Sequence, residues 1–450
     1  MFIGIDVGTS FIKGAVIDAE KPALSHTERI AFPPFLSGLP HGHREADPAE
    51  IFLAVDDLLA RLMPLAGRCE GLLLCGQMQG FVLVNGRGEP AGNFVSWLDQ
   101  RASGEEFDEI RNCITSEERH QLGNELRPGI ALPLLFWLKR HGALPRGNVT
   151  PVSIADMITA RLCGTLPAMD PTQAAAFGAL RLDTLAWHQQ VIGKLGLDSL
   201  RWPEVRPSGS VAGTWRGIPC YAAVGDQQCS LAGALLRDRE LSVNISTGSQ
   251  VSLIGDWSPH EEHQTRPYFD GRSLRTITHI PAGRALGALV GLLTELGGAP
   301  RGDAWRQIET AVASVGSTDL RASIAFSPGP CGHAGFLENL HEGNMSIGHL
   351  FRAAFESMAR NYHACARRLD PLGTAERVVF SGGVARRFEI LRDLVGAALN
   401  LPYRLSPHPE DSLFGLLVLS LAFSGRQKSV RDAVDVINGN SRYRMETNNP

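Results

Sequence analysis

The sequence predicts an α/β protein built from two related domains that face one another. Two stretches carry this prediction, residues 4–14 (GIDVGTSFIKG) and residues 243–251 (VNISTGSQV). Each is an apolar strand, a turn of small and hydroxyl residues, and a second apolar strand. One lies at the start of the chain and the other at the start of its second half. A chain of 450 residues is also too long for one ordinary core, which favours more than one domain.

The composition is typical of a globular protein and argues against several classes of partner. Hydrophobic residues make up 44% and charged residues 20% of the chain. A net charge of −4 argues against nucleic acid or an anionic membrane surface as the main partner. We expect no secretory signal and no membrane span. The eight cysteines are scattered without a C-x-x-C pair, which predicts reduced thiols and a cytoplasmic location.

The first elements of the chain have clear local signals. A hairpin is expected from the strands Phe2–Val7 and Phe11–Asp18. A helix is expected over Pro48–Met63, because apolar residues recur there at helical spacing and Asp47 can serve as the N-cap. The proline at the first helical position fits the same interpretation.

The rest of the first half alternates between short strands and helices. Apolar runs at Gly71–Cys75 and Phe81–Val84 predict buried strands. Residues 101–200 are predicted to be mostly helical and to form an insertion on the first sheet. The expected helices lie near residues 104–112, 116–123, 133–141, 153–163 and 186–195.

The second half repeats this logic after a domain boundary between residues 236 and 237. Before the boundary we expect a strand at Cys220–Val224 and a helix at Gln227–Leu236. The two domains are therefore predicted to span residues 1–236 and 237–450. The expected elements of the second domain are a hairpin at 241–255, a strand at 378–380, and helices near 282–296, 303–314, 348–369, 388–399 and 411–423.

The turn of the first hairpin suggests a phosphate site. Such a turn exposes several backbone N–H groups in a concave nest, which suits a phosphate. Asp6 lies at the edge of this turn, where a carboxylate can hold a hydrated Mg²⁺ beside that phosphate. The chain has neither a P-loop motif nor a dinucleotide-binding G-x-G-x-x-G after a strand. We therefore expect a two-domain enzyme that acts on a nucleotide phosphate.

Two further clusters have side chains that suit a polyhydroxyl ligand. Gln77 and Gln79 follow an apolar strand, where sites form in α/β sheets, and their amides both donate and accept. On an extended chain Trp97, Asp99 and Arg101 share one face, a common arrangement for holding a sugar. Each cluster also has a structural interpretation. The first can be an ordinary glycine-flanked loop, and the second an Asp–Arg pair beside a half-buried tryptophan.

A third cluster, Gly225-Asp226-Gln227-Gln228, lies between a strand and a helix. Asp226 is a good N-cap for a helix beginning at Gln227. It is equally a carboxylate at the mouth of a sheet, where it can accept a hydroxyl proton. The residues alone leave both interpretations open.

Taken in order, these motifs resemble the FGGY family of carbohydrate kinases over nearly the whole chain. The opening at residues 4–10 is also similar to the wider actin-like ATPases, whereas the ordered motifs at 76–78, 97–101 and 225–228 are more specific. Residues 381–383 and 410–415 resemble the adenine-side segment of these kinases. The resemblance implies two ribonuclease H-like (actin-like ATPase) domains with a deep cleft between them. The first would bind the sugar and catalyse, and the second would bind the nucleotide.

The resemblance also implies residue roles. Asp226 matches the catalytic base, and Asp6 (through water) and Asp226 match the surroundings of Mg²⁺. Contacts with ATP and its phosphates are implied for Asp6, Gly8, Thr9, Ser10, Lys13, Thr247, Gly248, Ser249, Gly382 and Gly383. Contacts with the sugar are implied for Gln77, Met78, Gln79, Trp97, Asp99, Arg101 and Gln227. Many family members have His where this chain has Gln79, a departure that weighs against xylulose.

The expected activity is transfer of a phosphoryl group from ATP, with Mg²⁺, to a primary hydroxyl of a ketose or polyol. Residues 244–250 and the compact length are most similar to the sedoheptulokinase branch, so the sugar expected is a ketose such as sedoheptulose. Glycerol, xylulose and ribulose remain open as alternatives. So do a non-catalytic actin-like nucleotide-binding protein and a phosphohydrolase. The resemblance further implies a homodimer.

Overall fold

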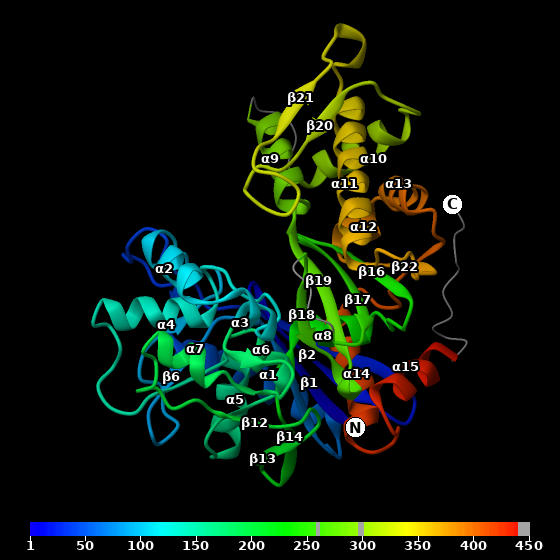
Figure 1. Cartoon of the computed structure of the whole chain (residues 1–450). Coiled ribbons are helices and arrows are strands. Elements are labelled where there is room, and N and C mark those ends of the chain that lie inside the picture. Colours follow the sequence, from blue (N-terminus) through cyan, green and yellow to red (C-terminus); the bar gives the residue numbers. More distant parts are fainter. Residues whose placement is uncertain (258–261, 296–300, 440–450) are drawn as a thin grey trace. The chain divides into compact units, whose positions relative to one another are not determined.

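The computed structural model describes residues 1–257, 262–295 and 301–439, and these residues form two compact units (Figure 1). Unit 1 contains the described parts of Met1–Leu235, Asp256–Leu274 and Glu410–Tyr443. Unit 2 contains the described parts of Leu236–Gly255 and Arg275–Pro409. The chain first passes from one unit to the other between Leu235 and Leu236, one residue before the boundary expected from the sequence. Unit 1 also includes two segments from later in the chain, and the packing of one helix accounts for the second of them.

The sheet of unit 1 places the first hairpin beside parallel strands from later in the chain. Strand β1 pairs antiparallel with β2 and parallel with β5, and β5 also pairs parallel with β15. The main path of the sheet has the order β13-β14-β5-β1-β2-β3. Its strands are β1 (Phe2–Val7), β2 (Phe11–Asp18), β3 (Ala23–Ala31), β5 (Leu72–Gly76), β13 (Val211–Trp215), β14 (Ile218–Tyr221) and β15 (Val224–Gly225). The predicted first hairpin is confirmed.

Helix α1 (Pro48–Ala66) packs on β2. The Asp47 carboxylate accepts a hydrogen bond from the Ala49 N–H at 2.8 Å, which satisfies one of the orphan donors at the helix start. The helix approaches the strand closely at Gly14, where a Cβ atom would lie 2.6 Å from Leu62 Cδ1. The predicted helix and its cap are confirmed.

Helix α14 (Asp411–Phe423) explains why the segment after residue 409 belongs to unit 1. It packs against α8 (Asp226–Gly233) and against β1. The two helices touch backbone to backbone at two glycines. A Cβ atom on Gly233 would overlap the Asp411 carbonyl oxygen, and one on Gly415 would overlap the Cys229 carbonyl oxygen. Such close packing of an almost wholly buried helix joins residues 410–423 to the first sheet.

The predicted insertion of unit 1 contains helices separated by short strands. The helices are α2 (Glu105–Cys113), α3 (Ser116–Gln121), α4 (Ala131–Arg140), α5 (Ile154–Cys163), α6 (Pro171–Ala175) and α7 (Gln189–Lys194). The short strands of unit 1 are β4 (Glu45–Ala46), β6 (Val82–Val84), β7 (Phe94–Val95), β8 (Thr150–Val152), β9 (Ala168–Met169), β10 (Leu180–Arg181), β11 (Ala186–Trp187), β12 (Glu204–Val205) and β18 (Gln264–Pro267). Helix α7 begins later than predicted because residues 186–187 pair with β10.

Unit 2 is organised around the second hairpin, which the structure also confirms. Strand β16 pairs antiparallel with β17 and parallel with β22. The strands are β16 (Glu240–Ile245), β17 (Ser249–Gly255), β19 (Ser273–Ile280), β20 (Arg321–Ser323), β21 (Phe336–Glu338), β22 (Arg377–Ser381) and β23 (Tyr403–Leu405). The helices are α9 (Gly283–Thr294), α10 (Arg301–Ala313), α11 (Ile347–Leu369), α12 (Gly383–Arg387) and α13 (Glu389–Leu399).

Several further features differ from the sequence prediction. Helix α15 (Val430–Gly439) follows the helix that was expected to be the last. Its first N–H groups are bound by the Asp270 carboxylate, which accepts from Val430 at 3.1 Å and from Arg431 at 2.9 Å. Strands β3 and β19 were not predicted, and the expected strand at 220–224 is divided between β14 and β15. Among the described residues, no helix combines the length and apolar character needed to cross a membrane.

Candidate active site

Three parallel strands of unit 1 end at the same level. In the sheet register Asp6 is opposite Cys75, and Cys75 is opposite Val224; the next residues along, Gly76 and Gly225, also pair. Each strand is followed directly by one of the predicted clusters: the first turn, the Gln77 loop and Asp226. Sites in α/β sheets form beyond the carboxyl ends of such strands. The structure therefore brings these clusters to one edge of the sheet.

A residue that the sequence analysis missed holds two of these strand ends together. Gln173, on α6, is fully buried, and its Nε2 donates to the carbonyl oxygens of Gly76 and Val224, both at 3.1 Å. A glutamine in a helical insertion carries no local signal of such a role. Its partners lie 97 and 51 residues away in the chain.

Asp6 lies at this edge and is only 7% exposed. The Ser412 hydroxyl donates to Asp6 Oδ2 at 2.5 Å, and the Cys75 thiol donates to Oδ1 at 3.7 Å. Burial raises the pKa of Asp6, and the Ser412 hydrogen bond and the Lys13 charge oppose that rise. Ser412 and Cys75 are two further residues that the sequence analysis did not place here.

Asp226 is half-buried and is the first residue of α8. Gly225, not Asp226, takes the N-cap position, so the capping interpretation does not describe this helix. The pKa of Asp226 is raised to about 7. Burial is the largest cause and the charge of Asp6 acts in the same direction, whereas Arg266 opposes the rise. A carboxylate with a pKa near neutral is suited to general base catalysis at neutral pH.

The residue before this carboxylate must be small. A Cβ atom on Gly225 would lie 2.6 Å from Gln228 Oε1 and 2.9 Å from Met78 Sδ. Met78 is accordingly buried and packs beside the strand end that leads to Asp226. Its predicted contact with a sugar stays a prediction.

The turn of the first hairpin, where phosphate contacts were predicted, is held by side chains of the neighbouring clusters. The hairpin closes through the Gly8 N–H, which donates to the Phe11 carbonyl oxygen at 3.1 Å. Trp97 Nε1 donates to Thr9 Oγ1 at 3.0 Å, and Gln77 Nε2 donates to the Gly8 carbonyl oxygen at 3.3 Å. Ser10 is exposed at the tip of this turn, as a phosphate contact would require.

Lys13 lies on β2 behind this turn and is paired. Its Nζ lies 2.5 Å from Glu410 Oε2. The segment 410–415 was expected beside the adenine with residues 381–383. Glu410 and Ser412 contact Lys13 and Asp6 within unit 1, while residues 381–383 belong to unit 2. The place of both segments beside the adenine stays a prediction.

The second turn lies in unit 2 beside the glycine turn that follows β22. Thr247 and Gly248 are exposed at its tip. Their predicted contacts with phosphate stay a prediction. Ser249 is buried, and its hydroxyl donates to the Asn244 carbonyl oxygen at 2.5 Å, so that hydroxyl is engaged within the hairpin. Gly382 has a φ of 89°, and a Cβ atom there would overlap the Ile245 carbonyl oxygen. Its neighbour Gly383 starts helix α12.

Asp99 and Arg101 form a buried ion pair. Asp99 is 0% exposed and accepts from Arg101 Nε at 2.9 Å and from the Arg44 N–H at 2.7 Å. The Arg101 guanidinium also contacts Glu45 Oε1 at 2.5 Å. These contacts fix the loop after β7 to β4. The predicted sugar contact of the pair stays a prediction. In this structure both side chains pair with other groups of the protein, Asp99 with the Arg44 N–H and Arg101 with Glu45.

Gln79 and Gln227 belong to one buried network. Gln79 Nε2 donates to Glu125 Oε1 at 2.8 Å, and Arg266 donates to Gln227 Oε1. Arg266 and Glu125 form a two-point ion pair, with Nε–Oε2 at 2.9 Å and Nη2–Oε1 at 3.0 Å. The sequence analysis identified neither Glu125 nor Arg266, the two residues that join Gln79 to Gln227.

The carboxylates at the strand edge fit a magnesium ion. Mg²⁺ usually binds one or two carboxylates, keeps several waters and takes its other ligands from substrate phosphates. Among the described residues there is no cluster of three or more His, Cys, Asp or Glu side chains suited to a metal. The charge of Asp6 adds to burial in raising the pKa of Asp226, so the two carboxylates are close enough to repel when both are ionised. A divalent cation would offset this repulsion.

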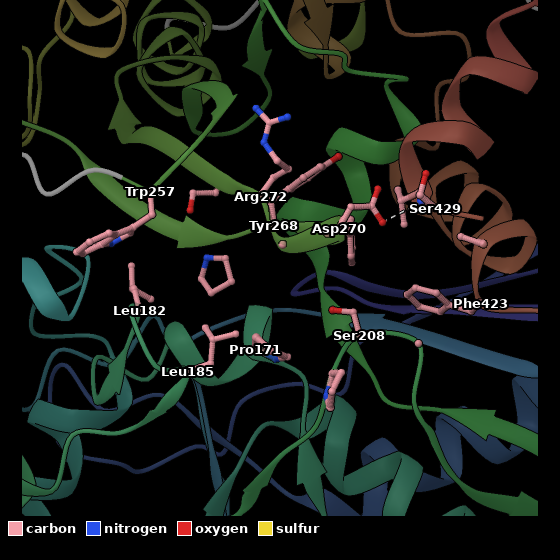
Figure 2. Close-up of a pocket in the computed structure, with 18 of the residues that line it drawn as sticks. Pro171, Leu182, Leu185, Ser208, Trp257, Tyr268, Asp270, Arg272, Phe423 and Ser429 are labelled. Atoms are coloured by element: carbon pink, nitrogen blue, oxygen red, sulfur yellow. Dashed lines mark hydrogen bonds between the residues drawn. The ribbon is translucent and has the colours of Figure 1, made fainter. Parts of the chain in front are cut away.

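A separate cavity of about 540 Å³ also lies in unit 1 (Figure 2). Trp257, Tyr268 and Phe423 contribute aromatic side chains to its wall. Asp270 also lines it and at the same time binds the start of α15. None of the predicted site residues lines this cavity.

Sequence comparisons find proteins that are similar to this chain. Residues 1–233 match the model of the N-terminal domain of the FGGY family of carbohydrate kinases. Mouse sedoheptulokinase is 25% identical over 486 residues, covering 95% of this chain and 98% of that protein. The xylulose kinase of Klebsiella pneumoniae is 28% identical over 247 residues, covering 52% of this chain and 50% of that protein.

Solved structures share the fold. A gluconate kinase from Lactobacillus acidophilus has a TM-score of 0.85 at 18% identity, covering 100% of this chain and 93% of that chain. A xylulose kinase from Rhodospirillum rubrum also has a TM-score of 0.85, at 22% identity, covering 96% of this chain and 92% of that chain. The predicted two-domain α/β fold is confirmed.

Proposed function

Because this chain belongs to the FGGY family of carbohydrate kinases, we propose that it transfers the γ-phosphoryl group of ATP to a primary hydroxyl of a ketose, with sedoheptulose as the sugar. The observation that supports this proposal best is the position of Asp226. It is a half-buried carboxylate with a pKa of about 7, at the edge where three predicted clusters meet.

In the proposed reaction Asp226 accepts the proton of the sugar hydroxyl as its oxygen attacks the γ-phosphorus. The bond between that phosphorus and the β,γ-bridging oxygen breaks, and ADP leaves. Mg²⁺, bound by Asp6 through water and by Asp226, would supply positive charge to the transferring phosphoryl group. The chain's own contribution is to orient the hydroxyl and to hold the base, because phosphoryl transfer asks mainly for positioning and charge stabilisation.

Sedoheptulose is proposed because the two sedoheptulokinases match nearly the whole chain. The mouse and human proteins are each 25% identical, over 95% and 93% of this chain. The xylulose kinases match only about half to three fifths of it. Xylulose, ribulose and glycerol are therefore the comparison substrates.

We also propose the remaining parts of the working enzyme. Unit 1 binds the sugar through the Gln77–Gln79 loop and Gln227, and unit 2 binds ATP through the second turn and the Gly382–Gly383 turn. Reduced cysteines support a cytoplasmic location, since all eight are free thiols. The family resemblance supports a homodimer, which sedimentation velocity measurements would test.

The experiment is a coupled assay of ADP release with Mg·ATP and sedoheptulose, ribulose, xylulose, glycerol or no sugar. We expect the largest kcat/KM with sedoheptulose. A thermal-shift screen of the same sugars gives an independent readout, because a ligand at a hundredfold excess over Kd adds about 2.7 kcal/mol of stability. ADP release that no sugar stimulates would contradict the proposal and favour a nucleotide sensor or a phosphohydrolase.

A further inference from the structure

The loop that follows β5 has an unusual backbone conformation at one position. Gln79 has a φ of 78°, in the left-handed region that side chains other than glycine rarely adopt. Such a conformation is unfavourable by itself and persists where surrounding contacts enforce it, often at functional sites. The contact that holds this side chain is the hydrogen bond from its Nε2 to Glu125 Oε1.

Glu125 is itself fixed by arginines. It is 1% exposed, and the guanidinium of Arg266, 4% exposed, binds both of its oxygens. Arg127 Nη2 lies 3.8 Å from Glu125 Oε1. One buried and one half-buried guanidinium group therefore lie beside this carboxylate, and their charges lower the pKa of Glu125 and keep it ionised.

This arrangement determines which end of the Gln79 amide remains for a further hydrogen bond. An amide has a donor NH₂ and an acceptor carbonyl. The NH₂ of Gln79 is bound to a carboxylate that can only accept, so the opposite orientation would place two oxygens together. The carbonyl Oε1 of Gln79 is thus left as the group that can meet a ligand. A neighbouring hydroxyl must donate to it.

We propose that Glu125 and Arg266 are positioning residues of the sugar site, which fix the Gln79 amide so that its Oε1 selects a substrate hydroxyl that donates a hydrogen bond. The inference rests on the proposed function and adds the element that discriminates between sugars. A ketose or polyol with a hydroxyl at that point binds. An analogue with that hydroxyl removed, or replaced by a group that only accepts, is rejected, because Oε1 then loses its partner.

The Glu125–Arg266 pair also contacts Gln227, the residue after the proposed base. Arg266 donates to Gln227 Oε1 while it holds Glu125. The ion pair therefore joins two predicted sugar contacts, one from the loop after β5 and one from the start of α8. A disturbance of either charged residue should affect sugar binding through both amides.

The test measures KM for the sugar and for ATP in Gln79→Met, Glu125→Asp and the double variant. Gln79→Met removes the carbonyl at nearly constant size. Glu125→Asp keeps the charge for Arg266 but shortens the side chain by one methylene. We expect each single variant to raise the sugar KM roughly tenfold with little change in the ATP KM. We expect the double variant to be no worse than the poorer single variant, because Glu125→Asp already disturbs the contact that Gln79→Met removes.

A matched control is available in unit 2. Glu240 forms an equally buried pair with Arg404, with an Nη2–Oε2 distance of 2.8 Å. Glu240→Asp should lower the unfolding temperature without changing the sugar KM. The unfolding temperatures of all variants separate a loss of stability from a loss of substrate positioning.

The outcomes are distinguishable. Multiplicative effects of Gln79→Met and Glu125→Asp on the sugar KM, or equal effects on the KM values for sugar and ATP, would overturn the positioning role while leaving the kinase activity in place. The same holds if Glu125→Asp folds normally and keeps the wild-type sugar KM. A wild-type protein that phosphorylates no sugar would overturn the proposed function, and this inference with it.

Discussion

Replacement of Asp226 by Asn tests the proposed base with almost no change in shape. A general base contributes roughly 10²–10⁴ to the rate, so kcat should fall by that factor. The structure adds a second expectation, because the pKa of this carboxyl is raised to about 7. A group with that pKa is about 10% ionised at pH 6 and about 90% ionised at pH 8. In the wild-type protein kcat/KM should therefore rise about ninefold over this interval.

The assay is ADP release with saturating Mg·ATP and varied sugar, at pH values from 5.5 to 8.5. The residual activity of Asp226→Asn should lack the rise near pH 7. A variant that keeps the wild-type kcat, or that keeps the same rise with pH, would refute the assignment of Asp226 as the base.

Stability provides the folding control for the same variant. The folded-state pKa of Asp226 lies above its unfolded value, so its contribution to stability is fully present below about pH 4 and is lost as pH rises through about 7. Asn carries no such penalty. Asp226→Asn is therefore expected to unfold at a higher temperature than the wild type at pH 8, with a smaller difference near pH 4.

Three other perturbations address the site and its support. Ser412→Ala removes the donor to Asp6 and should lower the free energy of unfolding by about 1–3 kcal/mol and reduce kcat, whereas Ser420→Ala on the same helix should leave kcat unchanged; urea titration and the coupled assay check both. Gly415→Ala inserts a methyl group against the α8 backbone and should cost about 1–3 kcal/mol or more in urea titration, while Gly248→Ala, which faces open space, should not. Chelation of Mg²⁺ by EDTA should abolish phosphoryl transfer and excess Mg²⁺ should restore it; sugar-dependent turnover that persists without a divalent cation would contradict the metal role.

The sequence predicted those features whose causes are local. Both hairpins pair residues that are no more than 15 positions apart, and the cap of α1 lies one residue before the helix. The sequence could place Asp6 beside the first turn and the Gln77 loop after an apolar strand, whereas the parallel pairing that makes these two strand ends neighbours is known only from the structure. These patterns depend on period and turn chemistry, which one sequence displays directly.

The missed features depend on contacts between distant residues. The cap of α15 comes from Asp270, 160 residues before Val430. Glu125 meets Arg266 across 141 residues, and a glutamate in a polar stretch gives no sign of burial. Strand β3 has the polar sequence ALSHTERIA and becomes recognisable as a strand only beside β2. Tertiary context decides each of these cases.

The hydrogen bond between Ser412 and Asp6 spans 406 residues, and this has a consequence for biosynthesis. A ribosome delivers β1 and its carboxylate long before the helix that carries Ser412. The intervening chain, including the whole of unit 2, is made while the apolar surface awaiting α14 remains uncovered. Nascent chains should therefore need protection from aggregation until translation has passed residue 423, and the buried carboxylate of Asp6 should reach its final environment only after that point.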